Sequence, residues 1–490
     1  MKIFVGQINP IVGAVENNVQ AIIETLESAR AEGAELVVFP QLVISGAPMH
    51  DLLFHEDVVD ACELGLEEIA PATEGLDVIL GAPAMSEGAL YDSAVIFHDG
   101  VEVARQFQAQ VAWSLCGRKV AVVVGEQSYD EKLGRVDLIV HLAASPWCAG
   151  AREGRCRAIC ERAEALRTPY LFVNLVGGSD EWIFDGGSLY VGGDGLWQAP
   201  CFEESCSMVE PEDIELEQGA VLQEVRQALV MGIRDYYDKQ GVEIAHVALS
   251  GGIDSSVTAA LAVEALGSRR VEGVFMPSKC TSDQSAKAVK RLARQLSILW
   301  RTISIDPMVD AFVGALGSCE GLVHENVQSR VRAVLLMALS NRAGSMVLGT
   351  SNKSEVTLGY ATLYGDMTGA LLPLGDVFKS QVYFLAKEMG LPEEIISRAP
   401  TAELHVGQAD TDDLPEYRML DPILEAMVLG GMGIGEIAEH APIDKGEIEG
   451  IYQKMWEGEY KRRQAPCILR TSPRAFGSEA RYPIVNALRW

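Results

Sequence analysis

A short segment rich in glycine and serine, SGGIDSS (residues 250–256), has the residue types and spacing of an anion-binding loop. An apolar run ends just before it at Leu249, and an apolar periodicity typical of a helix extends from about Ser255 to Leu266. The first N–H groups of a helix have no partner within the helix and lie at the positive end of its dipole. Glycines also let an anion approach the backbone closely. The segment therefore predicts a site for a pyrophosphate or triphosphate group.

The side chains of this segment support that prediction. The hydroxyls of Ser250, Ser255 and Ser256 add donors, and Asp254 is placed to ligate a metal ion. The GK[ST] ending of a Walker A loop is absent. A glycine turn before an ordinary helix would explain SGG alone. The full SGGxDS pattern after a buried strand resembles the loop of enzymes that cleave ATP to AMP and pyrophosphate while adenylating a carboxylate or an amide.

Beyond this loop, the chain carries further motifs from about residue 220 to its end: MPSKCTSDQS (276–285), ENVQSRVR (325–332), LGTSNKSE (348–355), GYATLYGD (359–366), PLGDVFKSQV (373–382), APTAEL (399–404) and EYKRRQAP (459–466). With these motifs, this part of the chain resembles the NAD synthetases. Enzymes that make GMP, asparagine or argininosuccinate share the SGGxDS loop but not the other motifs.

The resemblance implies a role for each matching position. In this family the nicotinate carboxylate of deamido-NAD attacks the α-phosphorus of ATP, and ammonia then displaces AMP from the adenylate. Magnesium and a lysine can offset charge on the leaving pyrophosphate. The implied residues are Ser250, Gly251, Gly252, Asp254, Ser255 and Ser256 for the ATP phosphates; Asp254 and Glu355 for Mg²⁺; Thr350 and Lys379 for ATP; Thr401 on a loop that closes over the phosphates; and Asn326, Glu355 and Lys461 for the deamidated dinucleotide.

The first 200 residues resemble the nitrilase-type amidase domain that is fused to NAD synthetases which use glutamine. The matching stretches are QINPIVGAVENN (7–18), ELVVFPQLVISGAPMHDLL (35–53), LAASPWCAG (142–150) and VNLVGGSDEWIFDGGS (173–188). The resemblance implies glutamine hydrolysis by a cysteine nucleophile, a glutamate base and a lysine. The chain has Gly125, Gln41 and Gln108 at these three positions. We therefore expect an inactive, structural amidase domain and a synthetase that uses free ammonia.

Two alternatives remain open at this point. A separate glutaminase could bind the amidase-like domain and supply ammonia, or the chain could be a nucleotide-binding pseudoenzyme. One departure points toward the members that use glutamine. Members that use only ammonia carry a lysine between the threonine and tyrosine of the TxYGD segment, where this chain has Leu363.

The length of 490 residues predicts more than one domain. We expect an α/β chain: a nitrilase-like α-β-β-α sandwich over residues 1–200, an acidic linker over 201–220, and an adenine-nucleotide α-hydrolase-like domain with a parallel, Rossmann-like sheet over 221–490. Strands are expected at Lys2–Gln7, Leu36–Phe39, Val78–Gly81, Val120–Val124, Leu138–Leu142 and Tyr170–Val173, with helices at Asn17–Ala31 and about Ala220–Gln240.

Composition limits the partners. A formal net charge of −29 opposes binding to nucleic acid and to anionic membranes, so neither is expected. The ten cysteines include no CxxC pair, and we interpret all ten as reduced thiols. The chain begins without the pattern of a signal peptide, and no apolar run reaches the roughly 18 residues of a membrane helix. We expect a cytoplasmic protein, and the family resemblance implies a homo-oligomer.

Overall fold

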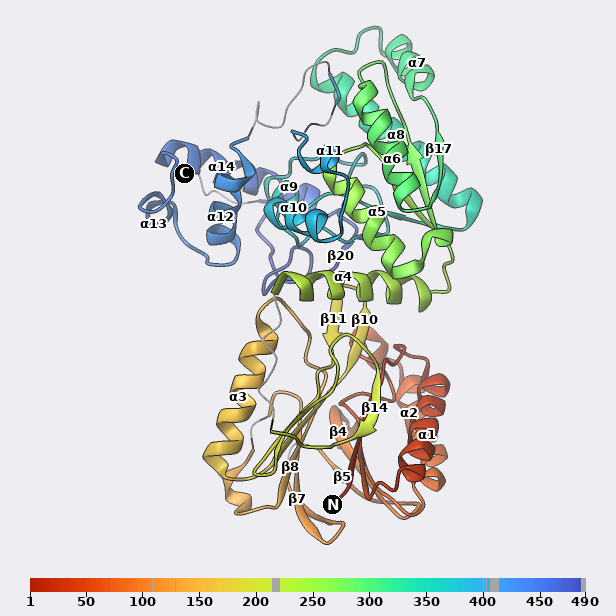
Figure 1. Ribbon diagram of the computed structural model, residues 1–490, viewed down its shortest axis with the longest axis vertical. Coiled ribbons are helices and arrows are strands. Elements are labelled where there is room, and N and C mark those ends of the chain that lie inside the picture. Colours follow the sequence, from red (N-terminus) through yellow and green to blue (C-terminus); the bar gives the residue numbers. More distant parts are fainter. Residues whose placement is uncertain are drawn as a thin grey trace. The chain divides into compact units, whose positions relative to one another are not determined.

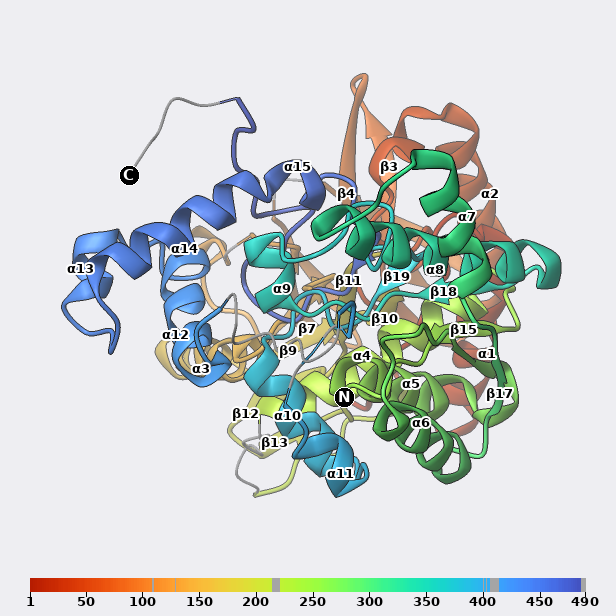
Figure 2. The ribbon, with the colours of Figure 1, turned by 90° about the horizontal axis from the view of Figure 1, so that it is seen from above.

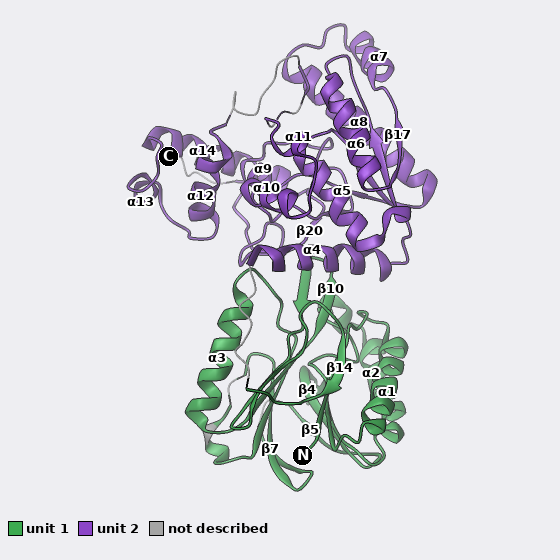
Figure 3. Cartoon of the chain, in the orientation of Figure 1, with its two compact units in different colours: residues 1–220 green, residues 221–490 purple. Residues whose placement is uncertain are grey.

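The computed structural model describes residues 1–107, 110–127, 129–213, 221–399, 401, 403–405 and 414–485. The chain divides into two compact units, residues 1–220 and residues 221–490 (Figure 3). Within the described residues, no helix has both the length and the apolar character needed to cross a membrane.

Unit 1 contains two six-stranded sheets with helices on their outer faces (Figure 1). The first sheet has the order β14-β1-β2-β3-β4-β5, and the second has the order β13-β12-β9-β8-β7-β6. The strands are β1 Ile3–Gln7, β2 Leu36–Val38, β3 Asp77–Ser86, β4 Ala89–His98, β5 Val101–Gln106, β6 Ala112–Leu115, β7 Arg118–Val124, β8 Leu138–Ala143, β9 Tyr170–Asn174, β12 Leu189–Gly192, β13 Gly195–Gln198 and β14 Ser205–Met208, with a separate hairpin of β10 Val176–Ser179 and β11 Trp182–Asp185.

The alternation of side chains along the strands produces the layers. Phe4 and Val37 pack against the buried stripes of α1 (Val15–Ala31) and α2 (Glu56–Ala72), whereas their neighbours Val5 and Val38 pack against the second sheet. The opposite face of the second sheet packs against α3 (Ala151–Leu166). The predicted α-β-β-α sandwich is therefore confirmed.

The predicted acidic linker is corrected in part. Residues 205–208 form β14, which pairs antiparallel with β1 from Phe4↔Met208 to Gln7↔Ser205. Main-chain hydrogen bonds at the edge of a sheet do not require apolar side chains, so an acidic, polar segment can still add a strand. The rest of the predicted linker, 214–220, lies outside the described residues.

Unit 2 is built around a parallel sheet with the order β17-β16-β15-β18-β19-β20. Its strands are β15 Ala245–Ala248, β16 Val271–Phe275, β17 Leu299–Thr302, β18 Met346–Leu348, β19 Leu371–Leu372 and β20 Cys467–Ile468. Its helices are α4 Val221–Asp238, α5 Ile253–Leu266, α6 Asp283–Gln295, α7 Asp306–Leu316, α8 Leu322–Ala343, α9 Lys353–Leu358, α10 Lys379–Glu388, α11 Glu393–Ile396, α12 Tyr417–Val428, α13 Ile434–Ala438, α14 Lys445–Glu457 and α15 Glu459–Arg462.

The strand order determines where a ligand can bind. The chain moves outward in one direction from β15 through β16 to β17, and in the other direction from β18 through β19 to β20. In such doubly wound sheets, ligands bind beyond the carboxyl ends of the strands at the point where the direction reverses. That point lies between β15 and β18. Figure 2 shows α12, α13 and α14 grouped away from α6 and β17, and these helices share an apolar core with α9.

Candidate active site

The loop after β15 has the geometry expected of an anion site. Gly251 has φ +84°, and a Cβ atom there would lie 2.9 Å from the Ser285 carbonyl oxygen, so the loop requires glycine at this position. The Oγ atoms of Ser250 and Ser255 lie 3.1 Å apart, and the Gly252 N–H donates to Ser250 Oγ at 3.1 Å. Ser256 is buried, and its hydroxyl donates to the Gly252 carbonyl at 2.7 Å, so this side chain stabilises the loop from within.

Two carboxylates and one ammonium group meet beside this loop. Lys379 Nζ lies 2.6 Å from Asp254 Oδ2 and 3.3 Å from Glu355 Oε1. Asp254 is in the first turn of α5, Glu355 is the third residue of α9, and Lys379 is the first residue of α10. Three helix N-termini thus bring together residues that are far apart in the sequence.

The local sequence fixes the direction of these side chains. Asn352 caps α9 by accepting from the Glu355 N–H at 3.1 Å, and its amide donates to Asp254 Oδ1 at 3.0 Å. The Lys379 side chain is 3% exposed, and its Nζ lies 5.2 Å from the centre of the Tyr417 ring. Because burial removes water from the ammonium group, the two carboxylates are needed to hold its charge.

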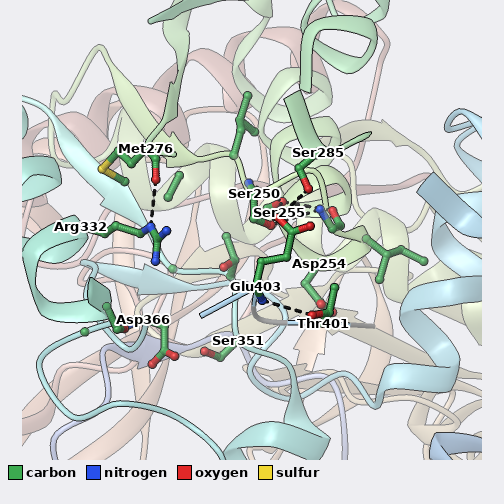
Figure 4. Close-up of a pocket in the computed structure, with 18 of the residues that line it drawn as sticks. Ser250, Asp254, Ser255, Met276, Ser285, Arg332, Ser351, Asp366, Thr401 and Glu403 are labelled. Carbon is green, nitrogen blue, oxygen red and sulfur yellow. Dashed lines mark hydrogen bonds between the residues drawn. The ribbon is translucent and has the colours of Figure 1, made fainter. Parts of the chain in front are cut away.

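A pocket of about 270 Å³ opens at the reversal point between β15 and β18 (Figure 4). Its walls include Ser250 and Asp254 after β15, and Thr350 and Ser351 after β18. Among the described residues that line it, four side chains are acidic and three are basic: Asp254, Glu355, Asp366 and Glu403 against Arg332, Lys379 and Arg398. The lining therefore does not by itself neutralise a polyphosphate, which needs a further cation.

Asn326 and Lys461, which were predicted to contact the dinucleotide, lie behind one wall of the pocket and support it. Asn326 on α8 accepts from Thr362 Oγ1 at 2.7 Å, and Lys461 Nζ donates to the carbonyls of Gly359 and Ala361, both at 2.7 Å. Neither Asn326 nor Lys461 is among the lining residues. Both instead hold the segment 359–366, which contributes Asp366 to the pocket.

Asp366 has an unusual environment. Its carboxylate is accessible from the pocket, but protein surrounds it on the other sides, and this desolvation raises its pKa to about 6. It accepts from the Thr362 N–H at 2.8 Å. Burial also lowers the pKa of Arg332, whose Nε donates to the Met276 carbonyl at 3.0 Å. Figure 4 shows Arg332 and Asp366 across the pocket from Ser250 and Ser255.

The pocket also contains residues that sequence reasoning did not select. Arg332 and Asp366 lie within motifs used for the family resemblance, but their types alone did not distinguish them from surface charges. Arg398 and Glu403 flank Thr401, and only the fold places them against the start of α6. By contrast, Asp254, Ser255, Thr350, Glu355, Lys379 and Thr401 were all predicted, and all line this pocket.

In unit 1 the structure brings two of the three altered amidase positions together. Gly125 follows β7, and a Cβ atom there would lie 3.3 Å from the side-chain amide of Gln41. The Gln41 amide donates to Asp92 at 2.6 Å and accepts from the Ala144 N–H at 3.1 Å. Burial raises the pKa of Asp92. Gln108 lies outside the described residues.

Comparison with known proteins decides the family. Residues 225–465 match the NAD synthase family model. Glutamine-dependent NAD(+) synthetases from Acinetobacter baylyi and Xylella fastidiosa are 33% and 35% identical to this chain, each covering 100% of it and 99% of their own length. The chain belongs to the glutamine-dependent NAD synthetase family. NAD synthetases are ligases that form carbon–nitrogen bonds, so the family assignment favours an enzyme over the pseudoenzyme alternative.

Solved structures agree with this assignment. Glutamine-dependent NAD⁺ synthetase from Acinetobacter baumannii, in complex with ADP, has a TM-score of 0.76 at 32% identity, covering 99% of this chain and 98% of that one. The enzyme from Cytophaga hutchinsonii has a TM-score of 0.86 at 19% identity with the same coverage, and this likeness supports the fold.

The expectation of an inactive amidase domain and an ammonia-only enzyme is wrong. Relatives that match this chain over its full length, including unit 1, are named as glutamine-dependent. The altered residues Gln41 and Gly125 are therefore not sufficient to assign an ammonia-only enzyme.

Proposed function

We propose that the chain amidates deamido-NAD to NAD with ATP, takes the nitrogen from glutamine, and releases AMP and pyrophosphate. The observation that carries the proposal is the cluster of Asp254, Glu355 and Lys379 beside a glycine-rich loop, at the reversal point of the sheet. This arrangement suits a triphosphate, because backbone N–H groups of the loop would face the phosphates and Lys379 would offset the charge that develops on the leaving pyrophosphate.

The residues of the pocket also fit a magnesium ion. Mg²⁺ prefers oxygen ligands and is usually held by one or two carboxylates together with substrate phosphates. Asp254 and Glu355 supply two carboxylates that meet at one ammonium group, and the acidic balance of the lining calls for a cation when ATP enters. Bound there, the ion would offset phosphate charge, while Lys379 would hold the pyrophosphate and the loop would orient the α-phosphorus.

A direct test uses the purified chain with deamido-NAD, ATP and Mg²⁺. One reaction contains glutamine labelled with ¹⁵N in its amide, and a parallel reaction contains ¹⁵N-ammonium; mass spectrometry then follows the label into NAD. We expect labelled NAD from glutamine, and its loss in Lys379→Met. Label from ammonium alone would refute the glutamine step, whereas no NAD from either donor would refute the whole proposal.

Glutamine hydrolysis also needs a nucleophile. Position 125 has no side chain, so under this proposal the attacking group lies elsewhere in the chain. A diazoketone analogue of glutamine alkylates such a group, and peptide mapping would then locate it. The division of residues 1–200 and 221–490 into amidase and synthetase domains, the homo-oligomer and the cytoplasmic location remain predictions.

A further inference from the structure

Glu403 makes a set of contacts that the proposed chemistry does not explain. Its two carboxylate oxygens accept from Ser282 Oγ and Ser285 Oγ, both at 2.7 Å. Arg398 Nη2 also donates to Oε1 at 2.5 Å, and Arg398 Nη1 donates to Ser285 Oγ at 2.8 Å. The side chains of Arg398 and Glu403 are 12% and 18% exposed, so water screens this ion pair little.

The partners of Glu403 lie next to the phosphate-binding loop. Ser282 caps α6, and the Ser285 carbonyl lies against Gly251 of the phosphate-binding loop. The Glu403 carboxylate therefore docks at the positive end of α6, immediately beside the site for the phosphates. Figure 4 shows Glu403 between Ser285 and Thr401 in the pocket.

Glu403 also acts on Thr401 directly. Its backbone N–H donates to Thr401 Oγ1 at 3.2 Å, and both residues line the pocket. The next residue, Leu404, accepts through its carbonyl from the buried Gln328 of α8 at 2.8 Å. The segment is therefore anchored to α6 by a side chain and to α8 by its backbone.

We propose that Glu403 is a positioning residue for ATP: by docking on Ser282, Ser285 and Arg398, it holds Thr401 against the nucleotide pocket. This inference rests on the proposed ATP site. Glu403 itself does not act on the reacting atoms. Its contribution is to keep one wall of the pocket in place, so its loss should accelerate nucleotide release.

The test is Glu403→Gln, which keeps the size of the side chain but removes the charge that pairs with Arg398. A charge-assisted hydrogen bond is stronger than a neutral one, so we expect the KM for ATP to rise by about tenfold. We expect kcat to stay within about twofold of that of the unchanged protein, because the reacting groups remain. Stopped-flow measurements should show faster dissociation of a fluorescent, non-hydrolysable ATP analogue.

A matched control is Glu394→Gln. Glu394 also links α11 to α6, through Arg291 at 2.8 Å, but this pair is on the surface, with side chains 41% and 62% exposed. The control should leave the KM for ATP and the dissociation rate unchanged, as expected for a solvent-exposed pair. A third variant, Ser285→Ala, removes one donor to Glu403 and should change the dissociation rate in the same direction as Glu403→Gln.

Two results would overturn the proposal. Tighter ATP binding by Glu403→Gln would mean that the carboxylate competes with the phosphates, and unchanged binding would mean that the contacts only stabilise the fold. Analogue binding is measured without turnover, so this test is separate from that of the proposed reaction. If the unchanged protein binds the analogue but makes no NAD, the proposed function fails while the role of Glu403 is still decided.

Discussion

The buried pair of Lys353 and Asp376 provides the sharpest test of what holds the active site together. Both side chains are 0% exposed, and Lys353 Nζ lies 2.6 Å from Asp376 Oδ1. The ammonium group also donates to Ser472 Oγ at 2.7 Å and to the Arg474 carbonyl at 3.1 Å, so each of its three protons has an acceptor. Lys353 is the first residue of α9, two positions before Glu355.

The loss of folding free energy expected for Lys353→Met depends on which partners of Asp376 remain. Asp376 would keep donors from the N–H groups of Thr471 and Ser472, at 2.7 and 2.6 Å, but its buried charge would lose its counterion. Removing one partner of a buried pair costs about 3–5 kcal/mol, and we expect the lower end because these donors persist. Unit 2 should therefore unfold more readily, and ATP should bind more weakly because α9 positions Glu355.

Native-state hydrogen exchange read by mass spectrometry measures this effect locally. The free energy of opening should fall by about 3 kcal/mol for peptides that cover α9 and β20, and part of the loss should return in Lys353→Met/Asp376→Leu. Lys279→Met is the matched control, because Lys279 pairs with Asp310 at 3.0 Å on the surface and should change nothing measurable. Equal effects of the two lysine variants would refute the reasoning.

Three further predictions concern the loop, acid stability and charge in the pocket. Gly251→Ala should abolish ATP binding in calorimetric titration, since its Cβ would lie 2.9 Å from the Ser285 carbonyl, whereas Gly267→Ala, with the same φ of +84° and no neighbour within 4 Å, should bind normally. Burial lowers the pKa of His141 to about 4, so between pH 4 and 6.5 the unfolded state binds more protons than the folded state. The free energy of unfolding of unit 1 should therefore fall by up to about 3 kcal/mol as the pH drops from 6.5 to 4. In urea unfolding measured over a series of pH values, His141→Gln should remove this dependence. Desolvation raises the pKa of Asp366 to about 6, so its carboxylate is charged at pH 7.5 and neutral near pH 5. ATP should therefore bind Asp366→Asn more tightly than the unchanged protein at pH 7.5, and this difference in Kd should disappear near pH 5. A difference that does not change with pH would show that the charge of Asp366 does not affect ATP binding.

The sequence predicted those features that depend on neighbours along the chain. The glycine-rich turn, the helix after it and the acidic residue in its first turn are local, and the structure has all three in SGGIDSS. The buried parallel strands of unit 1 and β15 were also predicted, because continuous apolar runs are typical of strands covered on both faces. The antiparallel strands β4 and β12–β14 were missed, since their partners, and not their own residues, make them strands.

The residues at 41 and 125 show where local reading of the sequence misled. The chain does have glutamine and glycine at these positions, but the inference from them to an ammonia-only enzyme was wrong. Leu363, also a single residue, pointed toward the members of the family that use glutamine.

Only the tertiary structure decided how closely the charged side chains approach one another. Asp254, Glu355 and Lys379 are separated by 101 and 24 positions in the chain, and they meet because three helices begin at the same edge of the sheet. The same applies to Glu403, whose partners Ser282 and Ser285 lie more than 100 residues earlier. A sequence specifies the local conformation of each segment, whereas the distance between two charges, and with it their electrostatic interaction, exists only once the segments have packed.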